Sequence, residues 1–201
     1  MEIDTPHGPA RVHLHPVDDP LGALVLGHGA GGGVEAPDLV AATRAANSVG
    51  VSVALVEQPY LVAGKRSQAP APKLDEAWVA VLERLRDDAL SGLPVVVGGR
   101  SAGARVACRT AAETGAEAVL CLAFPVHPPG KGDDPSKSRL YELDSVGVPV
   151  LVVQGDRDPF GMPPDGPGRT VVRISGTHSL RSAGPVQEAV AGWLPGVLPR
   201  R

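Results

Sequence analysis

Short apolar segments alternate with helical segments along most of the chain, and this alternation constrains the fold more than any other feature. The apolar runs predict strands buried on both faces, because a sheet with one face in water would alternate apolar and polar residues. The pattern therefore predicts an α/β fold with a mostly parallel sheet, right-handed crossovers and helices on both faces. The predicted strands cover residues 21–27, 51–56, 95–97, 118–124, 148–153 and 170–174, and the helices cover 37–49, 73–90, 104–112, 139–143 and 185–194.

The N-terminal segment carries a different pattern. Residues 2–5 and 11–15 alternate around the sequence Pro-His-Gly-Pro, which predicts a short antiparallel hairpin at one edge of the sheet. His13 and His15 share the exposed face of its second strand. A metal pair there has no third ligand nearby, so we interpret both as solvated histidines.

Length and composition bound the class of protein. A chain of 201 residues buries one full core, and a net charge of -3 with dispersed arginines gives no basic stripe for nucleic acid. No apolar run approaches the length of a membrane span, and the start of the chain lacks a signal-peptide pattern. Cys108 and Cys121 lie in apolar runs without the spacing of a disulfide or metal site. We expect a single domain over residues 1–201 in the reducing cytoplasm, binding neither nucleic acid nor membranes.

A strand-turn-helix segment contains the sequence Gly-Arg-Ser-Ala-Gly at residues 99–103. It fits the pattern G-x-S-x-G, in which small residues let the strand bend sharply into the helix and expose the serine hydroxyl above the sheet. Ser101 would then lie at the helix N-terminus, where backbone N–H groups and the helix dipole favour developing negative charge. Alternatively, Ser101 only caps the helix after a glycine-rich turn.

Two further residues complete a catalytic set with Ser101. His178 follows the last predicted strand and is the candidate base, and Asp158 follows the preceding strand and would orient the imidazole. All three lie at carboxyl ends of predicted strands, where open α/β sheets place their sites, and the order Ser, Asp, His is the one expected on such a sheet. Asp156 is the competing acid, but we interpret it as a loop hydrogen-bond acceptor or an ion-pair partner of Arg157.

A glycine-rich sequence at residues 28–33 follows the first buried strand. Its small residues, including Gly29 and Gly31, would let a substrate approach the backbone. The N–H groups of Ala30 and Ala102 are candidates for an oxyanion hole, which stabilises the negative oxygen formed during acyl transfer.

The same segment permits a different interpretation. Residues 27–32 match G-x-G-x-x-G, and Glu57 ends the next strand, where a dinucleotide-binding fold keeps the acid that binds ribose. However, residues 33–36 separate the glycines from the predicted helix, and this interpretation leaves the three candidate catalytic residues unexplained. We therefore regard dinucleotide binding as the minority interpretation.

Taken together, these motifs resemble those of the α/β-hydrolase superfamily. They are His-Gly-Ala-Gly-Gly at 28–32, Gly-Arg-Ser-Ala-Gly at 99–103, Gly-Asp-Arg-Asp-Pro at 155–159 and Thr-His-Ser at 177–179. Glu-Gln-Pro-Tyr at 57–60, the Gly-Arg-Ser turn and Phe-Pro-Val-His-Pro-Pro-Gly-Lys at 124–131 are similar to a small lidless group. That group includes bacterial dienelactone-hydrolase-like proteins, testis-expressed α/β-hydrolase-like proteins and a subunit of the NSL chromatin complex. The resemblance spans most of the chain from Leu21 onward.

The resemblance implies a three-layer α/β hydrolase fold without a cap domain. It implies Ser101 as nucleophile, Asp158 as acid, His178 as base, and Ala30 with Ala102 as oxyanion donors. The substrate would be a small carboxylic ester, lactone or thioester, cleaved through an acyl-serine intermediate without a metal or organic cofactor by a monomer or small homo-oligomer. A non-catalytic interaction module is the alternative.

One segment departs from the family pattern, and two polar residues beside the predicted site remain to be assigned. Residues 162–168 lack the helix that most such hydrolases place before the last strand, which predicts an extended loop. Arg100 either forms an ion pair with Glu57, which we prefer, or holds a substrate carboxylate. His127 either lines the pocket or belongs to a structural turn set by its prolines, the simpler interpretation.

Overall fold

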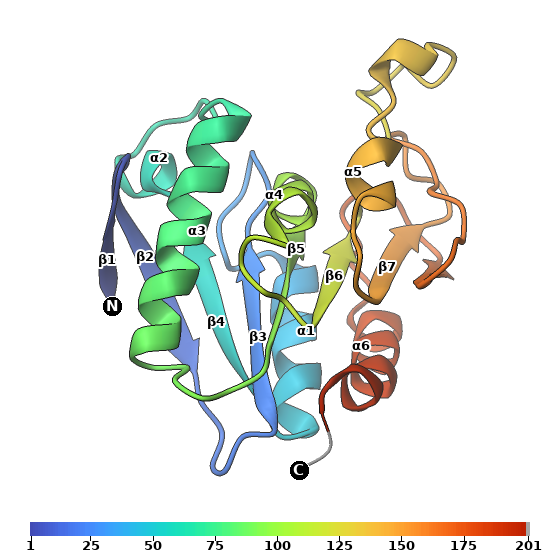
Figure 1. Cartoon of the computed structure of the whole chain (residues 1–201). Coiled ribbons are helices and arrows are strands. Elements are labelled where there is room, and N and C mark those ends of the chain that lie inside the picture. The colour runs from blue at the N-terminus through green and yellow to red at the C-terminus, as the bar shows by residue number, and fades with distance from the viewer. Residues whose placement is uncertain (200–201) are drawn as a thin grey trace.

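Eight strands form one sheet in the order β1-β2-β4-β3-β5-β6-β7-β8 in this computed structural model, which describes residues 1–199 (Figure 1). The strands are β1 (Glu2–Thr5), β2 (Gly8–His15), β3 (Gly22–Gly27), β4 (Val51–Glu57), β5 (Val95–Arg100), β6 (Ala118–Leu122), β7 (Val150–Gly155) and β8 (Arg169–Ile174). From β4 to β8 the neighbouring strands are parallel, whereas β1–β2 and β2–β4 are antiparallel. The predicted mostly parallel sheet with an antiparallel N-terminal edge is confirmed.

Helices cover both faces of the sheet. They are α1 (Pro37–Ser48), α2 (Pro59–Val62), α3 (Ala71–Asp87), α4 (Ala102–Thr110), α5 (Leu140–Asp144) and α6 (Ala183–Val197), with a 3₁₀ turn over Pro135–Lys137. One apolar cluster joins the sheet to α3 and α4, and a second joins the opposite face to α1 and α6. The result is the predicted arrangement of three layers.

The alternation of side chains along each buried strand explains why both faces need a cover. In β3, Val25 belongs to the cluster beneath α3 and α4, whereas Leu24 and Leu26 belong to the cluster beneath α1 and α6. Because successive side chains of a strand point to opposite faces, an apolar run has no face suited to water. Trp78 of α3 is only 1% exposed and packs in the first cluster, as a core residue would.

Two short helical elements were not predicted: α2, which follows β4 directly, and the 3₁₀ turn. Residues 161–168 form no helix, so the predicted extended connection between β7 and β8 is confirmed. No helix within residues 1–199 combines the length and apolar character needed to cross a bilayer. Loops of very different length follow the carboxyl ends of the parallel strands, and the candidate site lies among these loops.

Candidate active site

The turn between β5 and α4 holds Ser101 in a backbone conformation that few residues other than glycine adopt. Its φ is 53° and its ψ is -108°. The flanking glycines are required because a Cβ on Gly99 would lie 2.5 Å from the carbonyl oxygen of Gly27, and a Cβ on Gly103 would overlap the same oxygen. The close approach of β3, β5 and α4 thus depends on the glycines of the G-x-S-x-G sequence.

The structure brings Ser101, His178 and Asp158 together in one chain of hydrogen bonds. His178 Nε2 lies 2.9 Å from Ser101 Oγ, and His178 Nδ1 lies 2.8 Å from Asp158 Oδ2. Since a carboxylate can only accept, Nδ1–H donates to Asp158 and the lone pair of Nε2 accepts the serine hydroxyl. This arrangement can take a proton from the serine as its oxygen attacks an electrophile.

Asp158 is fixed by its own loop. Its side chain is fully buried, Gln154 Nε2 donates to Oδ2 at 2.9 Å, and the backbone N–H of Phe160 donates to Oδ1 at 2.8 Å. The Phe160 ring also stacks on the His178 imidazole, with centroids 4.1 Å apart. Sequence reasoning missed Gln154 and Phe160, although a glutamine in an otherwise apolar strand is a signal that could have found the first.

The competing acid takes the other predicted role. Asp156 Oδ1 accepts a hydrogen bond from the backbone N–H of Gly176 at 2.9 Å and lies 3.8 Å from Arg157 Nε. Asp156 is thus a loop acceptor just after β7, and the acid hydrogen-bonded to His178 is Asp158 instead.

His28 anchors the start of the glycine-rich loop. Its Nδ1–H donates to the carbonyl oxygen of Gly29 at 2.8 Å, and its Nε2 accepts from the backbone N–H of Gln58 at 3.0 Å. Burial lowers the pKa of His28, so the ring is neutral, as these two bonds require.

The strand order differs from that of a dinucleotide-binding sheet. In such a sheet the third parallel strand along the chain lies next to the second, whereas here the third parallel strand, β5, lies next to the first, β3.

A cavity of about 330 Å³ opens above Ser101. Among the described residues, the N–H groups of Ala30 and Ala102 have no hydrogen-bond acceptor, so both remain available to an oxyanion. No Asp or Glu of the described chain lines this cavity. Its lining consists of Ala30, Gly31, Gln68, Arg100, Ser101, Ala102, Arg105, Pro125, Arg139, Phe160 and His178.

Two candidate substrate-binding residues lie outside this lining. Gly29 packs against Arg100, since a Cβ on Gly29 would lie 2.7 Å from Arg100 Nη1. His127 donates from Nδ1 to the carbonyl oxygen of Pro128 at 2.8 Å, and its ring packs beside Gly161. The structure therefore places His127 in a turn, the simpler of its two interpretations.

The expected ion pair between Arg100 and Glu57 is wrong. Arg100 Nε instead lies 3.0 Å from Oδ2 of the fully buried Asp38, at the start of α1. Glu57 pairs with Arg11 and His13 of β2, because the antiparallel register places Arg11 directly opposite Glu57. Sequence reasoning did not consider Asp38.

Arg100 links this buried pair to the catalytic geometry. Its Nη2 donates to the carbonyl oxygen of His178 at 3.2 Å. Burial raises the pKa of Asp38 to about 6, although the nearby Arg100 charge acts in the opposite direction. Arg100 thus ties the His178 loop to α1 through a carboxylate that is costly to keep charged.

The other two arginines of the cavity differ in their partners. Arg105 donates two hydrogen bonds of 2.7 Å to Glu142, and the Glu142 carboxylate balances the charge of Arg105. Arg139 forms no ion pair with any of residues 1–199, and burial, together with the Arg105 charge, lowers its pKa. The cavity therefore carries an unbalanced positive charge that an anionic group would relieve.

The described part of the chain contains no group of three or more His, Cys, Asp or Glu side chains that could hold a metal ion.

Comparisons with known proteins identify relatives. The sequence profile of the Alpha/beta hydrolase domain family matches residues 21–168. A comparison with curated proteins found no match, so the narrower resemblance to the testis-expressed and NSL-complex proteins stays a prediction.

Several solved structures share the fold. XC6422 from Xanthomonas campestris, described as an a/b serine hydrolase without lid, has 22% identity and a TM-score of 0.79, covering 100% of this chain and 95% of that chain. Est1E from Butyrivibrio proteoclasticus, solved with ferulic acid bound, has 19% identity and a TM-score of 0.78 over 100% of both chains. A dienelactone hydrolase from Anabaena variabilis has 17% identity and a TM-score of 0.77, covering 99% of this chain and 97% of that chain.

Proposed function

Because the chain belongs to the Alpha/beta hydrolase domain family, we propose that it is a serine hydrolase that cleaves a small carboxylic ester, lactone or thioester. The observation that carries this proposal is the hydrogen-bond chain from Ser101 Oγ through His178 to Asp158, with distances of 2.9 and 2.8 Å. A protein that used the fold only as an interaction module would have no need to keep this chain of three side chains.

The proposed reaction begins with the attack of Ser101 Oγ on the carbonyl carbon while His178 Nε2 takes the hydroxyl proton. Asp158 stabilises the imidazolium, and the N–H groups of Ala30 and Ala102 stabilise the negative oxygen of the tetrahedral intermediate. His178 then returns the proton to the leaving group, which leaves an acyl-serine. A water molecule activated by His178 releases the acid, so the cycle needs no cofactor.

The size of the cavity supports a small substrate. Its volume of about 330 Å³ lies at the lower end of the range for ligand sites, and no segment within residues 1–199 forms a separate cap over it. Est1E, solved with ferulic acid bound, and the dienelactone hydrolase share the fold, and cleavage of a small ester or lactone fits the hydrogen-bond chain at Ser101.

A cytoplasmic location belongs to the same proposal. Cys108 and Cys121 are both buried and form no disulfide, with sulfur atoms 3.5 Å apart, which fits a reducing compartment. We also propose that the protein acts as a monomer or small homo-oligomer.

Labelling with a fluorophosphonate probe, alongside hydrolysis of p-nitrophenyl acetate, tests the proposal. The wild type should be labelled at Ser101 and should release p-nitrophenol, and Ser101→Ala should lose both properties. A folded wild type that is silent in both assays would instead support the interaction module. A tightly bound nicotinamide cofactor visible by absorbance would support dinucleotide binding.

A further inference from the structure

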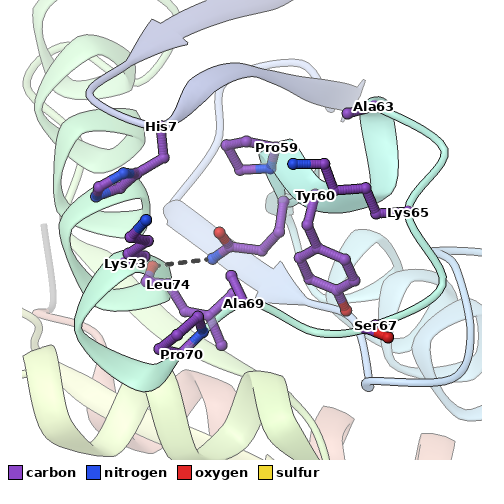
Figure 2. Close-up of a pocket in the computed structure, with 11 residues that line it drawn as sticks. His7, Pro59, Tyr60, Ala63, Lys65, Ser67, Ala69, Pro70, Lys73 and Leu74 are labelled. Atoms are coloured by element: carbon purple, nitrogen blue, oxygen red, sulfur yellow. Dashed lines mark hydrogen bonds between the residues drawn. The ribbon is translucent and has the colours of Figure 1, made fainter.

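A second cavity, of about 380 Å³, lies beside α2 and the first turn of α3 (Figure 2). Three of its lining residues, Gln58, Pro59 and Tyr60, come from the Glu-Gln-Pro-Tyr sequence, which the proposed reaction does not use. It shares no lining residue with the cavity above Ser101. Its volume lies within the range of small-molecule sites.

Gln58 presents an unsatisfied acceptor in this cavity. The residue is 6% exposed, and its Nε2 donates to the carbonyl oxygen of Leu74 at 3.1 Å. Its Oε1 is buried without a hydrogen-bond partner in the described structure. Because a buried carbonyl oxygen without a donor is unfavourable, a ligand that supplies an O–H or N–H would be stabilised here.

Two lysines give the cavity a positive charge. Lys65 and Lys73 line it and form no ion pair with any described residue, and neither Asp nor Glu of the described chain lines it. Figure 2 shows Lys65 reaching from its loop toward Pro59, with Lys73 beside His7 on the other side. His7 is already engaged, since its Nε2 lies 2.6 Å from Glu76 Oε2. The two ammonium groups are therefore free to bind an anion.

Part of the remaining lining is apolar and includes Pro70, Leu74 and the ring of Tyr60. Burial raises the pKa of Tyr60, so its hydroxyl stays neutral, and it donates to the carbonyl oxygen of Ala30 at 3.4 Å. These apolar residues suit the flat, uncharged body of a small ligand.

We propose that this cavity binds a small hydroxylated organic carboxylate as a second ligand site. The carboxylate pairs with Lys65 and Lys73, the hydroxyl donates to Gln58 Oε1, and the apolar body packs against Tyr60 and Pro70. The proposal does not depend on the proposed hydrolase activity, because none of these residues lines the cavity above Ser101.

Three related probes test the recognition. 4-Hydroxybenzoate carries both polar ends, benzoate lacks the hydroxyl, and 4-hydroxybenzyl alcohol lacks the carboxylate. In calorimetric titrations of the full chain, 4-hydroxybenzoate should bind about fivefold more tightly than either of the other two. Equal affinity for all three, or no binding of 4-hydroxybenzoate, would overturn the proposal.

Variants assign the binding to this cavity. Lys65→Gln and Lys73→Gln should each weaken 4-hydroxybenzoate binding by about fivefold, which is the upper end of the effect expected for an exposed ion pair. Lys131→Gln, an exposed lysine outside the cavity, is the matched control and should bind like the wild type. Gln58→Met should remove the preference for 4-hydroxybenzoate over benzoate, and the lysine variants keep the test decisive if this variant fails to fold. Binding unchanged in the double lysine variant would overturn the proposal, whether or not the protein proves to be a hydrolase.

Discussion

The variant Asp38→Asn tests whether the Arg100 ion pair serves the catalytic geometry at the expense of stability. The Asp38 side chain is fully buried, Oδ2 lies 3.0 Å from Arg100 Nε, and Oδ1 accepts the backbone N–H of Leu39 at 3.0 Å. Burial nevertheless raises the pKa of Asp38 from 3.8 to about 6. The charged carboxylate is therefore less favourable in the folded protein than in the unfolded chain.

The sign of the pH effect follows from this difference. Because the pKa is higher in the folded state, that state binds more protons between about pH 4 and pH 6, and the free energy of unfolding falls as the pH rises through this range. The difference between a pKa of 3.8 and a pKa of about 6 corresponds to about 3 kcal/mol of unfolding free energy, which is lost by pH 8. The asparagine introduced by Asp38→Asn is neutral throughout, so the variant should be more stable than the wild type at pH 8 by about 1–3 kcal/mol. The lower end of this range allows for the unfavourable case in which an N–H of the asparagine amide faces the Arg100 guanidinium.

The same variant should lose activity. Without the carboxylate, Arg100 is held less firmly, and its hydrogen bond of 3.2 Å to the carbonyl oxygen of His178 is weakened. We expect kcat for p-nitrophenyl acetate to fall by about tenfold with little change in KM, because the imidazole is positioned less well.

Urea unfolding at several pH values between 4 and 8 measures the stability effect, with Asp133→Asn as the control for an exposed acid. The reasoning fails if Asp38→Asn is less stable than the wild type at pH 8, or if its stability still falls between pH 4 and 6. The first result would mean that the attraction of the Arg100 charge outweighs the cost of burial, as for ion pairs whose disruption leaves an uncompensated charge. The second result would mean that a group other than Asp38 causes the fall in stability.

Three further substitutions test other parts of the site. Gly103→Ala places a Cβ over the carbonyl oxygen of Gly27 and should lower the free energy of unfolding by about 3 kcal/mol in urea titrations, whereas Gly184→Ala, with open space around it, should not. Gln154→Met removes a donor to Asp158 and should lower kcat about tenfold without changing KM. Arg139→Gln should lower kcat/KM for mono-p-nitrophenyl glutarate about fivefold and leave p-nitrophenyl acetate within about twofold, and equal losses for both esters would contradict a role in recognising anions.

Much of the fold could be predicted because its signals are local. Apolar runs identify strands buried on both faces, and the sequence Gly-Arg-Ser-Ala-Gly identifies the sharp turn at Ser101. The meeting of Ser101 with Asp158 and His178 then follows from topology, since the carboxyl ends of parallel strands lie at one edge of the sheet. No single side-chain contact has to be known for that prediction.

The partner of Arg100 could not be predicted in the same way. Whether Arg100 meets Glu57 depends on the antiparallel register of β2, which places Arg11 opposite Glu57, and on the side of β5 from which the arginine leaves. The sequence alone indicates that Asp38 is an ordinary acidic residue in the first turn of a helix, where its charge would interact favourably with the helix dipole. Only the packing of α1 against the sheet shows that it is buried.

The missing helix between β7 and β8 raises the question of what holds Asp158 in place. The structure answers it within the loop itself: Oδ1 accepts the N–H of Phe160, two residues on, which closes a turn of the kind that Asp favours. Gln154 of β7 fixes the other oxygen, and the Phe160 ring rests on His178. The acid is therefore positioned by the strand end and a three-residue turn, so the connection to β8 can be an extended loop without loosening the hydrogen bond to His178.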